Sequence, residues 1–183
     1  MADHGHYVGA HGFDGRNFGA FEEIYRIPLI IAGSGISSAA HCEAQLSIAD
    51  IAATLCDLGD AEPIDVPDSR SFQPLLAQPD LIAPEFQTGY AECHGTRFPL
   101  MQRILWKGDW KFVFNGFDFD EWYNLRDHPE EVCNLAADVD QQHRIESRMA
   151  EIWSRVGDTG DRAILESQYF SMRLVCVGPS VAL

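Results

Sequence analysis

The residues of this chain best suited to bind a metal ion stand at its start, in the stretch MADHGHYVGAHGFDGRNFGA. Asp3 and His4 are adjacent, and Gly5 follows them. A carboxylate oxygen and an imidazole nitrogen are both ligands for divalent cations, and a glycine lets the backbone turn tightly beside them. The same residues also suit a solvated surface turn. The pattern therefore predicts either a cation site or a simple turn.

Two other groups of side chains in this stretch have a chemical interpretation. His4, His6 and His11 could form a zinc site, although zinc needs convergent ligands and the spacing does not fix His11 relative to the other two. Arg16 is the only lysine or arginine among the first twenty-five residues. Its guanidinium could hold an anionic substrate through paired hydrogen bonds, or it could pair with the two glutamates that follow it.

The composition limits the classes of partner. The 183 residues carry 13 Lys and Arg against 28 Asp and Glu, a formal charge of −15, which argues against a nucleic-acid partner and fits a divalent cation better. No apolar run reaches the ~18 residues that a membrane helix needs. The five dispersed cysteines form no CxxC pair, a pattern typical of reduced thiols in a cytosol; they are Cys42, Cys56, Cys93, Cys133 and Cys176.

The elements expected in the first part of the chain are a strand and two helices. The apolar run IPLIIAG, Ile27–Gly33, has the length and β-branched content of a strand covered on both faces, as in a parallel α/β sheet. A short helix over residues 18–26 precedes it and ends before Pro28. Residues 46–60 have apolar side chains at helical spacing, a Ser47–Asp50 capping pair and a terminating glycine, which predicts an amphipathic helix.

The second part has a different character. Five of the nine prolines lie between residues 63 and 84, so we place a domain boundary there, with residues 1–84 and 85–183 as the two parts. RILWKGDWKFVFNG predicts an antiparallel hairpin that turns at residues 107–109, and DEWYNL predicts a third strand. A helix is expected to begin at Pro129, and HRIESRMAEIWSRVG predicts a long amphipathic helix that ends before Gly157.

Several stretches, in order along nearly 160 residues, resemble the sulfatase family of the alkaline phosphatase superfamily. They are ADHG, GAHGFDGR and FEEIYRIPLIIAGSGI at the start, then SIADIAATLCDLGD and PDSRSFQPLL, and finally GDWKFVFN and DEWYNLRDHPEEVCNLA. The resemblance implies an α/β fold. It would comprise an incomplete C-terminal part of the large sulfatase α/β domain, which binds the metal, followed by a small antiparallel sheet packed with a C-terminal helix.

The resemblance also implies roles for individual residues. Asp3 and His4 match the pair with which sulfatases ligate a divalent metal, usually calcium. Arg16 matches the position of a lysine that contacts the sulfate, and arginine keeps the charge but differs in reach and geometry. His11 matches the histidine of a GxHG element; a catalytic role and a packing or loop-holding role both remain open for it.

One part of the family pattern is not found in this sequence. Sulfatases use a formylglycine nucleophile made from the Cys or Ser of a (C/S)xPxR motif in the first half of their chains. CHGTR has Cys93 and Arg97 at that spacing, but Gly95 replaces the proline and the stretch follows the metal pair instead of preceding it. We therefore expect a C-terminal portion without the formylglycine half and without sulfatase activity alone. Two protein ligands, where calcium takes about six to eight, predict weak calcium binding.

Three functional interpretations remain open. In an intact relative the partner would be a small molecule or glycan that carries a sulfate ester. A phosphonate monoester or phosphodiester hydrolase of the same superfamily shares the DHG stretch and the basic turn. The third interpretation is a non-catalytic remnant or binding module. In each case the apolar run Ile27–Gly33 would lack sheet neighbours, which predicts self-association through an exposed strand edge.

Overall fold

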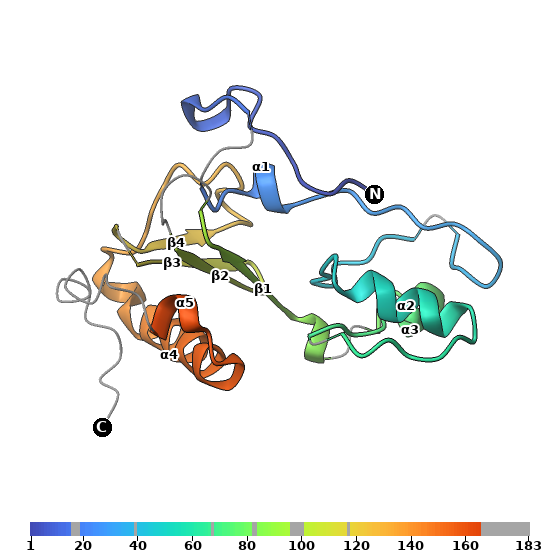
Figure 1. Cartoon of the computed structure of the whole chain (residues 1–183). Coiled ribbons are helices and arrows are strands. Elements are labelled where there is room, and N and C mark those ends of the chain that lie inside the picture. The colour runs from blue at the N-terminus through green and yellow to red at the C-terminus, as the bar shows by residue number, and fades with distance from the viewer. Residues whose placement is uncertain are drawn as a thin grey trace. The chain divides into compact units, whose positions relative to one another are not determined.

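The computed structural model describes two compact units (Figure 1). Met1–His4 and Ile27–Gly89 form one, here called the helical unit, and Gly5–Arg26 with the chain from Tyr90 onward forms the other, here called the sheet unit. Residues 5–26 thus group with the second half of the chain and not with their sequence neighbours. The structure describes residues 1–15, 19–38, 40–66, 68–81, 84–95, 101–116 and 118–165.

A four-stranded sheet organises the sheet unit. Its strands β1 (Thr88–Cys93), β2 (Gln102–Lys107), β3 (Trp110–Asn115) and β4 (Glu121–Asn124) lie in the order β1-β2-β3-β4. Strand β3 pairs antiparallel with both β2 and β4. The turn between β2 and β3 places Gly108 at φ 58°, a left-handed conformation that glycine adopts without a steric cost. The predicted hairpin and third strand are confirmed.

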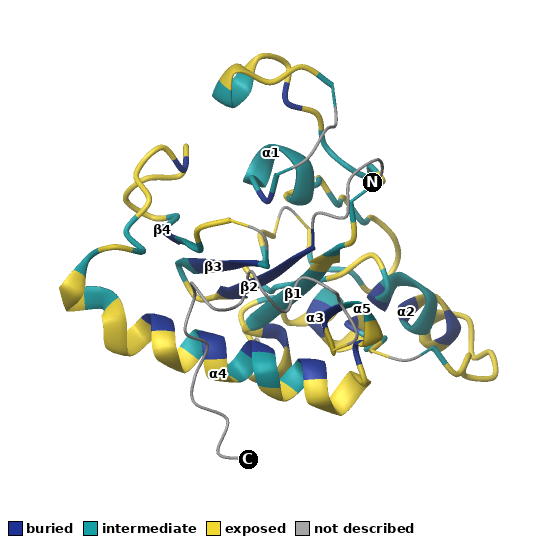
Figure 2. Ribbon diagram, turned by 60° about the vertical axis from the view of Figure 1, so that its left-hand side comes forward, coloured by how far each residue is buried: buried dark blue, intermediate teal, exposed yellow. Residues whose placement is uncertain are grey.

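Helix α4 (Gln142–Thr159) covers one face of this sheet. Its buried residues recur every three or four positions, and Figure 2 shows them as a stripe along the helix; they are Ile145, Met149, Ile152 and Val156. They pack against Leu105, Phe112, Phe114 and Trp122 of the sheet. The helix continues past Gly157, where it was expected to end, and Gly160 closes it at φ 61°. A short helix, α5 (Arg162–Leu165), follows, and the 3-10 turn η3 (Val139–Gln141) precedes α4.

The other face of the sheet is covered by the segment around α1 (Glu22–Tyr25). Ile104, Trp106 and Val113 point to this side because side chains alternate along a strand, and they pack with Ala20 and Tyr25. The helix is shorter than the predicted 18–26. The 3-10 turn η1 (Ala10–Gly12) lies in the same stretch of chain.

The prediction of a helix that begins at Pro129 is wrong. The segment is a succession of turns, in which the His128 amide donates to the Asn124 carbonyl at 2.9 Å and the Glu131 amide donates to the His128 carbonyl at 3.1 Å. Glu131 has φ 50°, which the interior of a right-handed α-helix does not accommodate. This left-handed turn lets the Glu131 carboxylate reach the interior of the sheet unit, where the residue is 2% exposed.

The helical unit contains α2 (Asp50–Leu58), α3 (Gln73–Ala77) and the 3-10 turn η2 (Pro84–Phe86). The predicted helix at residues 46–60 is confirmed. The Ser47 amide donates to Asp50 Oδ2 at 2.8 Å, which makes one half of the expected capping pair, and the Gly59 amide closes the helix on the Leu55 carbonyl at 3.1 Å. Phe72, Leu75 and Phe86 form the core of the unit.

The strand predicted for Ile27–Gly33 is not formed, so that prediction is wrong. Leu29 and Ile31 pack against the core of the helical unit, whereas Ile30 is 86% exposed, so one side of the segment is covered and not both. A strand needs a neighbour with which to pair its backbone, and no described residue of the helical unit supplies one. The run therefore stays extended chain.

The arginines, cysteines and helices named in the sequence analysis are placed as follows. Arg16, Arg97 and Cys176 lie outside the described residues. Cys42, Cys56, Cys93 and Cys133 are free thiols. No described helix has the length and apolar character that would let it cross a bilayer.

Candidate metal pair and its surroundings

Asp3 and His4 lie next to each other in the helical unit with their ligating atoms close together. The His4 amide donates to Asp3 Oδ1 at 3.0 Å, and His4 Nε2 is 3.7 Å from Asp3 Oδ2. Ligands held about 2.3–2.6 Å from a calcium ion lie roughly 3–4 Å from one another, so this spacing is compatible with one shared cation. The Asp3 side chain is 87% exposed and the His4 side chain 36%. A cation can therefore reach both ligand atoms.

The described residues do not complete a coordination sphere around this pair. Among them no three His, Cys, Asp or Glu side chains gather closely enough to hold a metal ion. That finding also leaves the zinc interpretation of His4, His6 and His11 without support, because all three are described. The pair alone offers two of the about six to eight ligands that calcium takes.

His11 is a packed side chain of the sheet unit. Its ring stacks on Phe21 with centroids 3.8 Å apart, and its Nε2 lies 3.4 Å from Glu23 Oε2. The side chain is only 12% exposed, and the residue has φ 53°, inside the 3-10 turn η1. His11 thus packs against Phe21 and lies near Glu23 within the sheet unit.

The glutamates considered as partners for Arg16 have other partners. Glu22 Oε1 accepts from Trp106 Nε1 at 2.7 Å and from Lys111 Nζ at 3.1 Å, while Glu23 faces His11. The Glu22 carboxylate is therefore hydrogen-bonded within the sheet unit, whereas Glu23 Oε2 is buried near His11 without a hydrogen-bond partner among the described residues. Arg16 itself lies outside the described residues.

Sequence reasoning missed a buried ionic cluster on the α1 side of the sheet. Lys111 Nζ lies 2.5 Å from Glu131 Oε1 and 3.1 Å from Glu22 Oε1, and the Lys111 and Glu131 side chains are 0% exposed. The Glu22 amide donates to Glu131 Oε2 at 2.7 Å. Burial raises the pKa of Glu131, and the neighbouring Lys111 opposes that rise. The cluster fastens α1 to the sheet; a lysine between Trp110 and Phe112 in a buried strand was its one sequence signal.

The sheet unit contains a second buried ion pair, between Arg103 and Asp161. Arg103, which is 0% exposed, donates from Nε to Asp161 Oδ2 at 2.7 Å, and its second terminal nitrogen lies 2.6 Å from the same oxygen. A charge-assisted hydrogen bond of this kind is shorter and stronger than a neutral one. The pair joins β2 to the turn between α4 and α5.

Other titratable groups respond to burial in the same unit. Burial raises the pKa of Asp120 to about 6, while the Asn115 amide that donates to the carboxylate opposes the rise. Burial also raises the pKa of Tyr90 to about 12 and the pKa of Tyr7, Tyr25 and Tyr123 well above the usual range. These tyrosines therefore stay protonated at neutral pH.

A family model matches the first third of the chain. Residues 1–61 match the family model described as Sulfatase. An uncharacterized sulfatase, YidJ, from Escherichia coli K12 is 29% identical over 159 residues, which cover 86% of this chain and 30% of the relative. A choline-sulfatase from Rhizobium meliloti strain 1021 is 31% identical over 139 residues, which cover 74% of this chain and 26% of the relative. The chain thus spans less than a third of the length of these relatives.

Comparison with solved structures gives a similar result. A putative sulfatase from Bacteroides thetaiotaomicron superimposes with a TM-score of 0.73 and 21% identity over 88% of this chain and 36% of its own. At that identity the likeness concerns the fold. It confirms an α/β chain that corresponds to part of a sulfatase structure.

Proposed function

The chain is related to the sulfatase family, and on that premise we propose that it supplies the C-terminal part of a hydrolase that cleaves sulfate esters. The observation that carries the proposal is the Asp3–His4 pair. It lies inside the matched residues 1–61, and its two ligand atoms are 3.7 Å apart and open to solvent. A carboxylate beside an imidazole is an ordinary donor set for a divalent cation.

Each residue has a distinct task in this proposal. Asp3 and His4 hold the cation, with calcium as the expected metal. A bound divalent cation supplies Lewis-acid polarisation of the sulfate oxygens. Arg16 binds the sulfate of the substrate through its guanidinium. His11, stacked on Phe21, keeps the intervening loop in place.

In this proposal no residue of this chain supplies the nucleophile. The sequence contains no (C/S)xPxR motif, and CHGTR has Gly95 where that motif has proline. We therefore propose that the chain as it stands has no appreciable sulfatase turnover. The substrate, a sulfate ester of a small molecule or glycan, would be cleaved only when the nucleophile is supplied by further polypeptide.

Calcium titration of the purified chain tests the metal assignment. Calorimetry or terbium luminescence measures the binding. We expect calcium to bind weakly and saturably to the unmodified chain, and this binding should be abolished in Asp3→Asn and in His4→Ala. Asp57→Asn, at an exposed position of α2 that also loses one carboxylate, serves as the matched control and should bind as the unmodified chain does. Binding that survives both Asp3→Asn and His4→Ala would exclude this pair as the site.

Assays with ester substrates test the activity assignment. The chain with calcium and 4-nitrophenyl sulfate should give no more product than its Asp3→Asn variant. Turnover that disappears in Asp3→Asn would overturn the proposed inactivity. When the chain is combined with the N-terminal portion of a sulfatase relative, hydrolysis of the sulfate ester would support the sulfatase proposal. Hydrolysis of a phosphonate monoester or phosphodiester instead would favour the other branch of the superfamily.

A further inference from the structure

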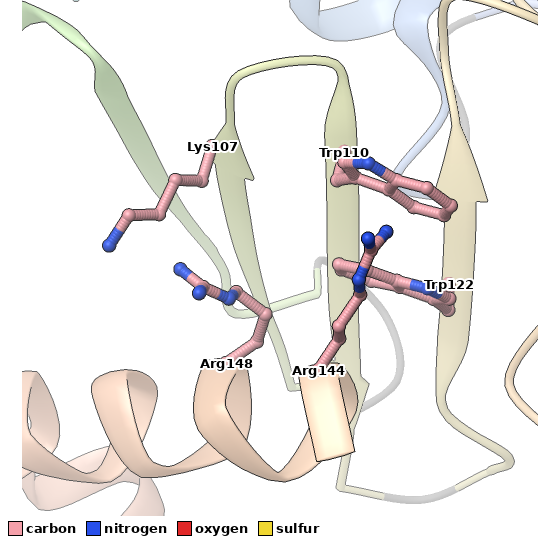
Figure 3. Close-up of a pocket in the computed structure, with 5 residues that line it drawn as sticks. All are labelled: Lys107, Trp110, Trp122, Arg144 and Arg148. Atoms are coloured by element: carbon pink, nitrogen blue, oxygen red, sulfur yellow. The ribbon is translucent and has the colours of Figure 1, made fainter. Parts of the chain in front are cut away.

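A hollow of about 290 Å³ opens between the sheet and α4, wholly within the sheet unit (Figure 3). Its lining contains three cations and two tryptophans; they are Lys107, Arg144, Arg148, Trp110 and Trp122. The chain as a whole has a formal charge of −15, with only 13 Lys and Arg. Three cations around one hollow therefore mark a place where an acidic protein can attract an anion.

The cations of the hollow are only partly neutralised. Lys107 Nζ and Arg148 each lie 3.0 Å from the same oxygen, Glu151 Oε2. Arg144 has no carboxylate within ion-pair distance among the described residues, and its guanidinium lies over the Trp110 ring at 5.1 Å. The three cations and the one carboxylate leave a formal local charge of +2, so an incoming anion would meet unsatisfied guanidinium donors.

The aromatic side of the hollow is a fixed surface. Trp110 and Trp122 stack with centroids 4.8 Å apart and an interplanar angle of 13°. Trp122 is 2% exposed, and its Nε1 donates to Gln141 Oε1 at 3.4 Å. The indoles come from adjacent strands, whereas the arginines come from α4, four residues apart and so on one helix face (Figure 3).

We propose that this hollow is a binding site for an oxyanion carried on a ring, of the class of sulfated or carboxylated sugars. Arg144 and Arg148 present planar donor pairs that match the oxygens of a sulfate or a carboxylate. The half-buried Trp110 indole, held in place by Trp122, offers an apolar surface to the ring. The proposal rests on these contacts alone and does not depend on the hydrolase function proposed above.

Binding to the full chain, in the presence of EDTA so that Asp3 and His4 hold no metal, tests the site. The probes are glucose 6-sulfate, glucuronate, glucose and inorganic sulfate. Their binding is measured by calorimetry and by tryptophan fluorescence. Glucose 6-sulfate or glucuronate, or both, should bind saturably and more tightly than glucose or inorganic sulfate. The two charged sugars separate a sulfate from a carboxylate specificity, and added salt should weaken the binding.

Variants place the binding in the hollow. Arg144→Ala and Arg148→Ala should each weaken it by about tenfold, as loss of a charge-assisted hydrogen bond predicts. Arg26→Ala removes an exposed arginine of the same unit that does not line the hollow, and it should bind as the unmodified chain does. Trp110→Phe keeps an aromatic ring in the core and should reduce the preference for the sugar over inorganic sulfate.

Three results would overturn the proposal. They are an absence of saturable binding by either charged sugar, an equal loss in Arg26→Ala and Arg144→Ala, and inorganic sulfate that binds as tightly as glucose 6-sulfate. Circular dichroism of each variant shows that it is folded. Arg144 is exposed, so its replacement is not expected to disturb the core.

Discussion

The sheet unit and the helical unit differ in the size of the apolar core that each closes. In the sheet unit, Leu105 and Phe112 are 0% exposed and Ile152 is 1% exposed. In the helical unit, Ile30 is 86% exposed and Leu55 is 62% exposed. The sheet unit thus closes the larger core, although Phe119 and Val139 are exposed in it. The buried core cluster of the helical unit is smaller and consists of Phe72, Leu75 and Phe86.

The difference teaches where the chain is self-sufficient. The sheet unit joins strands that follow one another through short connections, and one amphipathic helix covers a face of the sheet. The helical unit lacks a strand partner among its described residues, and the proposed metal pair lies in it. We therefore expect the sheet unit to carry most of the stability, and the less closed unit to carry the metal chemistry.

Removal of Lys111 should produce the largest loss of stability. Lys111→Ala leaves Glu22 and Glu131 as neighbouring carboxylates without the buried cation, which costs about 3–5 kcal/mol of the free energy of unfolding. Urea unfolding followed by tryptophan fluorescence measures it, because all four tryptophans lie in the sheet unit. Lys107→Ala, which loses a lysine at the exposed end of β2, is the matched control and should change little. Equal losses in the two variants would show that the cluster does not stabilise this unit.

Truncation of Ile152 tests the closed core directly. Ile152→Ala should lower the free energy of unfolding by about 2–4 kcal/mol, because it removes buried methyl groups and leaves a cavity between α4 and the sheet. The same urea titration measures it. A loss below about 0.5 kcal/mol, the range of an ordinary surface change, would mean that α4 is not packed on the sheet in solution.

Asp120 should make the stability of the sheet unit depend on pH. Its folded-state pKa of about 6 lies above the unfolded value of about 3.9, so the folded state holds the proton more tightly. The resulting stability is fully present below pH ~4 and is lost as the pH rises through ~6, by roughly 3 kcal/mol. Asp120→Asn, which mimics the protonated side chain, should match the unmodified chain at low pH and exceed it by that amount at pH 7.5. A difference that does not change between the two pH values would contradict the raised pKa.

The sequence predicts the elements whose determinants are local. The turn at Gly108 and the periodicity of α4 need only neighbouring residues, and both were predicted. The Lys111–Glu131 contact was not, because it joins residues that are twenty positions apart through a left-handed turn at Glu131, a residue for which that conformation is uncommon. Ile27–Gly33 was predicted to be a strand because strand propensity was present, but strand formation depends on a partner.

The candidate sites also differ in whether their residues are neighbours in the sequence or are brought together only by the fold. Asp3 and His4 could be selected from the sequence because two adjacent metal-ligand residue types are visible in it. The contacts of His11 with Phe21 and Glu23 depend on the fold of the loop and could not be predicted from the sequence. The hollow beside α4 escaped sequence reasoning altogether. Trp110 and Trp122 come from two strands and Arg144 from a helix, so only the packing of the sheet unit brings them together.

Leu55 offers the smallest expected effect and the sharpest comparison with Ile152. Both are large aliphatic side chains on helices, but the Leu55 residue is 62% exposed, so Leu55→Ala removes few contacts and should change stability by less than about 0.5 kcal/mol. Alanine also has the higher helix propensity, which favours α2 slightly. Hydrogen exchange of the α2 amides measures the effect, since the helical unit contains no tryptophan. A loss close to that of Ile152→Ala would mean that Leu55 is covered in solution, and the contrast between the two units would then fail at the helix where it is most pronounced.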